Sequence, residues 1–203
     1  TTEKADIEYL IQEVPKAVDQ TMDGVNQVAK IVRSMRKFSH PGQEKKTIID
    51  INEAIESTIT VARNEWKYVS DVVTNFDPSL PSIPCLPGEL NQVFLNMITN
   101  AAHSIGDVIG DGSNGKGTIK ISTQGFDDSV QIRISDTGTG IPEEIRSQIF
   151  DPFFTTKEVG KGTGQGLAIS YSVIVEKHGG TISFETEMGK GTTFTIKLPN
   201  VHP

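Results

Sequence analysis

Two glycine-rich segments are the part of this sequence best suited to chemistry. They are Asp136-Thr-Gly-Thr-Gly140 and Gly160-Lys-Gly-Thr-Gly-Gln-Gly166, and Phe150-Asp-Pro-Phe-Phe-Thr-Thr-Lys157 lies between them. Glycine lets the backbone approach a ligand closely and reach positive φ, at an entropic cost. Backbone N–H groups without side-chain bulk can cradle phosphates, so the two segments predict a phosphate-binding site.

Motifs and composition exclude several classes of protein. The chain has no G-x-x-x-x-G-K-[ST] and no G-x-G-x-x-G at a strand-to-helix junction, so P-loop and dinucleotide-binding sites are excluded. A formal net charge of −7 over 203 residues argues against nucleic-acid binding driven by phosphate neutralisation. Cys85 is the single cysteine, which excludes an internal disulfide. We expect a cytoplasmic fragment without membrane contact, because no signal peptide or long apolar run is found.

Residues 88–108 are predicted to form a long helix with two faces. Asn96, Asn100, His103 and Asp107 follow one another at steps of four, three and four, so they share a polar stripe. A merely solvated face would more often carry Glu or Lys, which are better helix formers than asparagine. Asparagine oxygens suit Mg²⁺, which also takes oxygens from nucleotide phosphates. The opposite stripe is apolar and consists of Leu90, Phe94, Met97, Ala101, Ile105 and Val108.

Asp136 allows two interpretations. It ends a predicted strand, and the glycines that follow let a ligand come close. Its carboxylate could accept a hydrogen bond from an amine such as the 6-amino group of adenine. Alternatively, Asp136 is an ordinary turn residue, and the glycines supply positive φ.

The second glycine segment also allows two interpretations. It leads directly into a predicted helix, whose N-terminal amides attract anions, and Lys157 and Lys161 could add positive charge near phosphates. Alternatively, it is a flexible surface loop with solvated lysines. Its length without periodicity is typical of a functional lid. We expect burial of Phe150, Phe153 and Phe154 to anchor the near end of this lid.

The remaining elements alternate between strands and helices. The predicted strands cover residues 47–51, 68–76, 118–124, 129–136, 181–187 and 192–198. The predicted helices cover residues 52–66, 88–108, 143–149 and 166–178, with Asn52 as the N-cap of the first. Proline residues punctuate a loop between 78 and 87, and Gly179 and Gly180 end the last helix. This order predicts an α+β fold in which helices cover one face of a mixed sheet.

Residues 1–39 are predicted to form a long helix before this domain. Its apolar residues follow a heptad-like seam consisting of Ile7, Ile11, Val14, Val18, Thr21, Val25, Val28, Val32 and Met35. Such a helix either forms a dimer stem with a second helix or packs on its own domain. We expect a domain boundary near residue 42, which gives segments 1–42 and 43–203. The chain begins with Thr1, and we expect it to be part of a longer protein.

The order of these motifs resembles the catalytic ATP-binding domain of sensor histidine kinases. Asn96-Met-Ile-Thr-Asn-Ala-Ala102 is similar to the asparagine box of that family, and Asp136-Thr-Gly-Thr-Gly-Ile-Pro142 to its first glycine box. The segment 150–157 resembles the phenylalanine box, and Gly162-Thr-Gly-Gln-Gly-Leu167 the second glycine box. The last strand contains Gly191-Thr-Thr-Phe194, which resembles the final strand motif. The resemblance covers about residues 47–199 and implies a Bergerat-type α/β sandwich, with a mainly antiparallel sheet.

The resemblance also implies a role for individual residues. Asn100 would bind Mg²⁺, Asn96 would bind the metal or its water, and both would serve catalysis. His103 would reach phosphate, and Asp136 would bind the adenine amine of ATP, with Thr192 near the ring. The other residues that the resemblance assigns to the nucleotide are Gly138, Gly140, Ile141, Lys157, Lys161, Gly162, Thr163, Gly164, Gln165, Gly166 and Leu167. Gln165 stands where leucine is commoner in the family.

One departure from the family concerns the phosphate acceptor. These kinases phosphorylate a histidine that is followed closely by an acidic residue, and this chain has no His-Glu or His-Asp pair. None of His40, His103, His178 and His202 is in such a setting. Residues 1–39 instead resemble the second dimerisation helix. We therefore expect the acceptor to lie on a helix of the parent kinase, with a response regulator receiver domain as the later partner and a possible homodimer through residues 1–39.

Three other functions compete with the kinase interpretation. A conformational ATPase of the same superfamily would carry a glutamate base four residues before the metal-binding asparagine, and Asn96 occupies that position. A scaffold that only dimerises and docks a partner would not need intact glycine boxes. A serine kinase of the anti-sigma type would not need the long helix at 1–39. These differences favour a histidine kinase fragment that binds ATP and Mg²⁺ without stable autophosphorylation.

Overall fold

A computed structural model describes residues 13–18, 21–22, 25, 45–110, 115–157 and 164–200. Residues 13–18, 21–22 and 25 are helical, as predicted, and Val14, Val18 and Val25 have more than half of their surface exposed. The rest of the predicted seam lies outside the described residues. The long N-terminal helix and the boundary near residue 42 therefore stay predictions.

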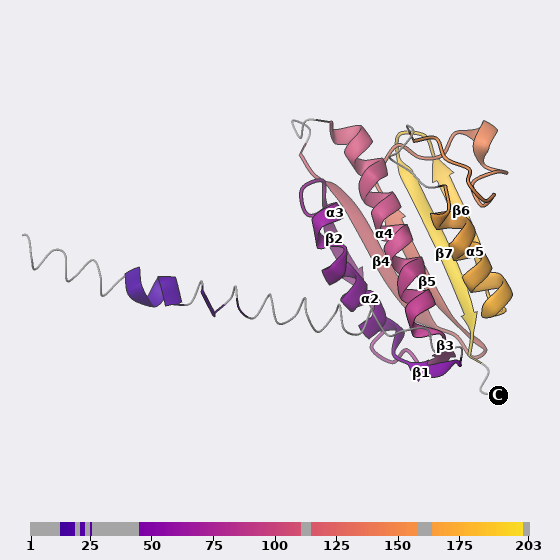
Figure 1. Ribbon diagram of the computed structural model, residues 1–203, viewed down its shortest axis with the longest axis horizontal. Coiled ribbons are helices and arrows are strands. Elements are labelled where there is room, and N and C mark those ends of the chain that lie inside the picture. The colour runs from indigo at the N-terminus through magenta and orange to yellow at the C-terminus, as the bar shows by residue number, and fades with distance from the viewer. Residues whose placement is uncertain are drawn as a thin grey trace, which may run out of the picture.

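A five-stranded mixed sheet forms one layer of the domain (Figure 1). Its spatial order is β2 (Ser70–Asn75), β4 (Gly117–Gly125), β5 (Ser129–Asp136), β7 (Gly191–Pro199) and β6 (Thr181–Glu187). Only β2 and β4 pair in parallel, and the other neighbours are antiparallel. The central pairing of β5 with β7 sets Ile134 opposite Phe194, so the buried sides of both strands face one way. The predicted mixed sheet is confirmed.

The helices form the second layer and lie together on one face of the sheet (Figure 1). They are α2 (Ile51–Val61), α3 (Arg63–Trp66), α4 (Pro87–Ile109) and α5 (Gly166–Tyr171), which continues as the π-helix η2 (Ser172–Lys177). A 3₁₀ turn, η1, covers Glu143–Ile145. A small two-stranded sheet of β1 (Thr47–Ile49) and β3 (Ile83–Cys85) lies beside the lower ends of α2 and α4.

The core lies between α4 and the sheet. The fully buried side chains of α4 include Leu90, Phe94 and Ile105, and they face isoleucines of β4, β5 and β7 such as Ile121 and Ile132. Burial of each large apolar side chain contributes about 1.5–3 kcal/mol. The apolar stripe of α4 thus fixes which way its polar stripe points.

The structure corrects several details of the sequence prediction. Val108 is 43% exposed, and Ile109 takes its place in the core. Asp50, rather than Asn52, caps α2 by accepting a hydrogen bond from the Glu53 amide. Asn52 instead donates to the Asp77 carbonyl and accepts from Thr123, which ties α2 to β4. The segment that was predicted as a loop because of its prolines contains the short strand β3.

Candidate functional site

Asp136 is buried at the end of β5, where the first glycine segment begins. It is only 9% exposed. Its Oδ1 accepts hydrogen bonds from the Gly138 amide at 2.8 Å and from the Thr192 amide at 3.3 Å. Burial raises the pKa of this carboxyl, although the two amide hydrogen bonds oppose the rise. Among the residues that the structure describes, none donates to Oδ2, so this oxygen is available to a ligand.

The first glycine segment packs tightly against α4. A Cβ on Gly138 would lie 2.2 Å from the Ser104 hydroxyl oxygen and 2.6 Å from the Ser104 carbonyl carbon, so a side chain cannot fit there. The Ser104 hydroxyl in turn accepts from the Thr139 amide at 3.0 Å. Ser104 was not predicted from the sequence. Its position next to His103 on the polar stripe was the available signal.

Threonine side chains join this segment to the last hairpin of the sheet. Thr192 is buried, and its hydroxyl lies 3.0 Å from the hydroxyl of Thr186. Thr186 also accepts from the Ile141 amide at 2.8 Å. The structure thus brings the predicted residues Asp136, Ile141 and Thr192 together with Gly138, while Gly140 lies against the Glu187 carbonyl. The role of Thr186 was missed, since a threonine alternating along a strand gives no functional signal.

The first of the two asparagines of α4 contacts the start of α5. The Asn96 Nδ2 donates to the Gly166 carbonyl at 2.9 Å, which leaves its Oδ1 as the accessible acceptor. Asn100 follows one turn later, is partly buried, and makes no side-chain hydrogen bond within the described part of the chain. Two neutral amide oxygens on one helix face are hard donors of the kind that Mg²⁺ accepts together with water and phosphate oxygens. The donor set therefore fits this metal.

His103 and Lys157 meet at the other end of the polar stripe. The Lys157 ammonium lies 2.5 Å from His103 Nδ1, and His103 Nε2 lies 3.7 Å from a Glu65 carboxylate oxygen. Burial, reinforced by the Lys157 charge, lowers the pKa of His103. Burial also lowers the pKa of Lys157, and Asp107 opposes this. A neutral imidazole that accepts from Lys157 satisfies both groups, so a cation is held at the edge of the site.

The lid between the phenylalanine segment and α5 is described only at its two ends. Lys161, Gly162 and Thr163 lie outside the described residues, so their expected roles stay predictions. Gly164 has φ +64°, and a Cβ there would lie 2.4 Å from the Phe153 backbone. The two ends of the lid therefore meet. Gln165 immediately precedes α5, and Leu167 packs partly buried against the core.

Two of the three phenylalanines are packed against the core, as expected. The Phe150 ring lies 5.5 Å from the Tyr171 ring and 6.1 Å from the Phe184 ring. Phe154 is also partly buried against the core. The expectation for Phe153 was wrong, because this residue is 71% exposed and has φ +67°. Its backbone, rather than its side chain, meets Gly164.

In the described ranges, no three His, Cys, Asp or Glu side chains lie close enough to hold a metal ion. None of the helices in those ranges combines the length and apolar character needed to cross a membrane.

Comparisons with known proteins agree with this geometry. A family model described as "Histidine kinase-, DNA gyrase B-, and HSP90-like ATPase" matches residues 86–202. The signal transduction histidine-protein kinase AtoS of Escherichia coli is 34% identical over 93% of this chain and 29% of its own length. Sporulation kinase E of Bacillus subtilis is 37% identical over 85% of this chain and 21% of its own. The chain thus spans less than a third of either relative.

Solved structures give the same result for the fold. The catalytic domain of histidine kinase ThkA matches with a TM-score of 0.65 and 29% identity, over 76% of this chain and 97% of that domain. ThkA solved in complex with the response regulator protein TrrA matches with a TM-score of 0.61 and 24% identity. That match covers 92% of this chain and 51% of the solved one.

Proposed function

Because the chain belongs to the family of histidine kinase-, DNA gyrase B- and HSP90-like ATPases, we propose that it binds Mg-ATP and transfers the γ-phosphoryl group to a histidine outside this chain. The matched region is the ATP-binding catalytic domain of two-component sensor histidine kinases. The observation that carries the proposal is the buried Asp136, whose Oδ1 is held by two amides while Oδ2 is available.

The adenine end of the proposed site is built around Asp136. A carboxylate held by the Gly138 and Thr192 amides is preorganised, so it accepts from the 6-amino group of adenine without reorganisation. Because Asp136 is buried, this hydrogen bond forms in surroundings where it is stronger than in water. The tight packing of Gly138 on Ser104 keeps the loop backbone in one position beside the ring.

The phosphate end of the proposed site is built from α4 and the two ends of the lid. Asn100 and the Oδ1 of Asn96, which accepts from no residue in the described ranges, would hold Mg²⁺, which neutralises charge on the triphosphate when bound. Lys157, held by His103, supplies a further positive charge at this end. We propose that Lys161 and the amides of residues 162–166 contact the phosphates, as the resemblance to the second glycine box implies.

Asn96 is the reason to propose transfer rather than hydrolysis. An amide cannot take a proton from water at neutral pH, and the Asn96 amide is already committed to the Gly166 carbonyl through Nδ2. Asn96 therefore helps to position the triphosphate but supplies no general base for water. Phosphoryl transfer to an external nucleophile depends mainly on such positioning and on charge stabilisation.

The histidines within the described residues are poor acceptors. His103 bonds to Lys157, and both ring nitrogens of the buried His178 are engaged in hydrogen bonds. We therefore propose that the acceptor lies on a histidine-bearing helix of the parent kinase. Transfer to a response regulator would follow, and the related ThkA has been solved with its regulator TrrA. Dimerisation through residues 1–39 belongs to the same proposal.

Titration with a non-hydrolysable ATP analogue tests the first half of this proposal. We expect saturable binding that is tighter with Mg²⁺ than with a chelator, and steady-state ATP turnover well below one per second. No binding would contradict the nucleotide site. Turnover of several per second would contradict the kinase assignment in favour of a conformational ATPase.

A further inference from the structure

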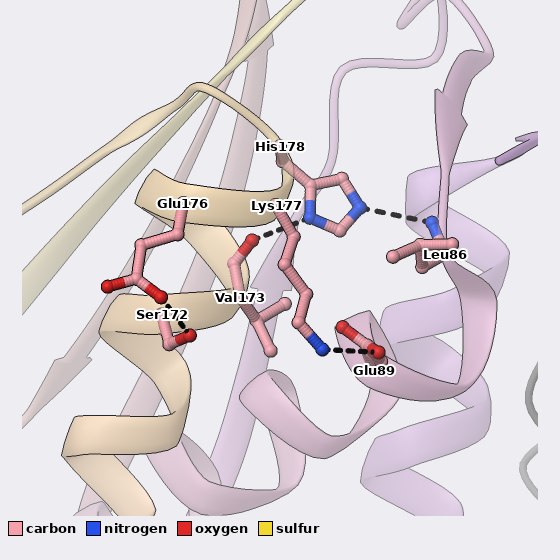
Figure 2. A network of polar contacts seen from close by, with 7 residues as sticks. All are labelled: Leu86, Glu89, Ser172, Val173, Glu176, Lys177 and His178. Atoms are coloured by element: carbon pink, nitrogen blue, oxygen red, sulfur yellow. Dashed lines mark hydrogen bonds and ion pairs between the residues drawn. The ribbon is translucent and has the colours of Figure 1, made fainter. Parts of the chain in front are cut away.

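His178 bridges the two helices that build the proposed nucleotide site (Figure 2). It lies at the end of η2 and is only 4% exposed. Its Nδ1 lies 2.6 Å from the Val173 carbonyl of its own helix, and its Nε2 accepts from the Leu86 amide at 3.0 Å. A neutral ring with hydrogen on Nδ1 satisfies both contacts, so the two partners together fix the tautomer.

The bridge completes the N-terminus of α4. Leu86 is the N-cap of this helix, but its own side chain accepts no capping hydrogen bond. In a capping box, a residue of the same helix satisfies the N-cap amide. Here His178, 92 residues away in the sequence, does so. The end of one helix is therefore tied to the beginning of another.

The two helices are joined again where α5 begins. Asn96 lies near the middle of α4, ten residues after Leu86, which is about 15 Å further along the helix. There its Nδ2 donates to the carbonyl of Gly166, the first residue of α5. His178 therefore ties the end of η2 to the start of α4, and Asn96 ties the start of α5 to the middle of α4.

We propose that His178, in its neutral form, is a positioning residue that sets nucleotide affinity by holding α5, which begins at Gly166, in register with the asparagines of α4. The inference rests on the proposed function. His178 itself contacts Leu86 and Val173 rather than any residue of the proposed site, so it acts through the helix pair.

Protonation would break the bridge. Hydrogen on Nε2 would oppose the Leu86 amide donor, and the new charge would face the N-terminus of α4. The charged groups around the ring are Lys46 before β1, Glu89 on α4 and Lys177 on η2, of which only Glu89 favours the cation. Lys177 already pairs with Glu89 at 2.7 Å. Cys85 of β3 remains a neutral thiol, since burial raises its pKa to about 12.

Protons can nevertheless reach the ring. A small cavity of about 40 Å³ adjoins it, lined in part by Lys46, Cys85 and Pro199. A space of this size can hold a water molecule. Burial, the largest cause, lowers the pKa of His178, so the bridge is intact at neutral pH and opens only in acid.

Two substitutions at His178 distinguish loss of the hydrogen bond from Leu86 from a general loss of folding. In His178→Gln, the side chain is long enough to offer an acceptor at the position of Nε2. In His178→Asn, the shorter side chain can reach the Val173 carbonyl but leaves the Leu86 amide unpaired. Ser172→Ala is the matched control, because it removes an exposed contact with Glu176 on the same helix and leaves the bridge intact.

The experiment measures hydrogen exchange at the Leu86 amide and the Kd of an Mg-bound ATP analogue between pH 8 and pH 5.5. For His178→Asn at pH 7.5 we expect exchange roughly five- to 150-fold faster. We also expect affinity roughly two- to 30-fold weaker. His178→Gln and Ser172→Ala should stay near the wild type. Below pH 6.5 the wild type should lose affinity more steeply than His178→Gln, while protonation of the nucleotide affects both equally.

Each outcome decides the inference. Faster exchange in His178→Asn with unchanged affinity overturns it, as do unchanged exchange or parallel pH profiles of the wild type and His178→Gln. If His178→Asn does not fold, the comparison of those two pH profiles still decides. If the wild type fails to bind the analogue at pH 7.5, the proposed function is contradicted. If the wild type binds it and His178→Asn binds it equally well, only the role of His178 is contradicted.

Discussion

Replacing Asp136 with asparagine separates nucleotide binding from stability. In the wild type the Gly138 and Thr192 amides both donate to Oδ1 of Asp136, and the side-chain oxygen of an asparagine can accept the same two hydrogen bonds. Its Nδ2, however, replaces the acceptor Oδ2 and would oppose the adenine amine. Losing a charge-assisted hydrogen bond costs about 1.5–3 kcal/mol, which weakens binding by roughly ten- to 150-fold.

The same substitution should not destabilise the domain. Burial raises the pKa of Asp136 in the folded state, so folding favours the neutral carboxyl and the ionised form costs stability above that pKa. A neutral amide avoids this cost. We therefore expect the unfolding midpoint of Asp136→Asn at pH 7.5 to equal or exceed that of the wild type.

Calorimetric titration with an ATP analogue and thermal unfolding measure the two effects on the same samples. Asp71→Asn is the matched control, because Asp71 is an exposed carboxylate on β2 that pairs with Lys116 at 3.5 Å. It should change neither quantity appreciably. Wild-type affinity in Asp136→Asn would refute the assignment of this residue to adenine. A large loss of stability would refute the argument from burial.

Three further predictions concern the metal, the packing and the pH dependence. Asn100→Ala should weaken the Mg²⁺-dependent part of ATP binding by at least about tenfold, since even outer partners of metal sites contribute that much; equal loss with a chelator present would contradict a metal role. Gly138→Ala should cost about 1–3 kcal/mol of unfolding free energy in denaturant titration, because its Cβ would meet Ser104, and full stability would contradict the close approach. The lowered pKa values of His103 and His178 contribute stability that is present above their ordinary pKa of 6.5 and lost as pH falls through the lower folded values. The thermal midpoint of the wild type should therefore drop on acidification, and that of His178→Gln should drop by less. An equal drop in the two proteins would show that His178 does not contribute to the pH dependence of stability.

The sequence predicted the sheet and α4 well because their patterns are long. Apolar and polar residues alternate strictly along β5, and apolar residues recur at steps of three and four along α4, so each pattern identifies one buried face. Shorter signals were less reliable. Asn52 and Asp50 are both good N-caps two residues apart, and only the contact of Asn52 with Thr123 and Asp77 decides between them. The three-residue β3 is too short to show periodicity.

Sequence reasoning proposed site residues where one residue type suits one chemistry, and their roles stay predictions. The asparagines of α4 stood out because asparagine is a poorer helix former than the Glu or Lys of an ordinary solvated face. Asp136 stood out because flexible glycines follow it, and the structure shows its carboxyl held by the Gly138 and Thr192 amides. Contacts between distant segments were not predictable. Thr186 and Ser104 hold the first glycine segment through partners 45 and 35 residues away. The sequence pattern presents His178 only as the last residue of a predicted helix.

The fate of the γ-phosphoryl group tests the central claim most directly. The chain is incubated with γ-labelled Mg-ATP, with and without the proposed histidine-bearing helix, and protein-bound label is compared with free phosphate. We expect label on the added helix that survives base and is lost in acid, with little free phosphate in either reaction. Rapid release of phosphate without the helix, or acid-labile label on this chain alone, would contradict the central claim.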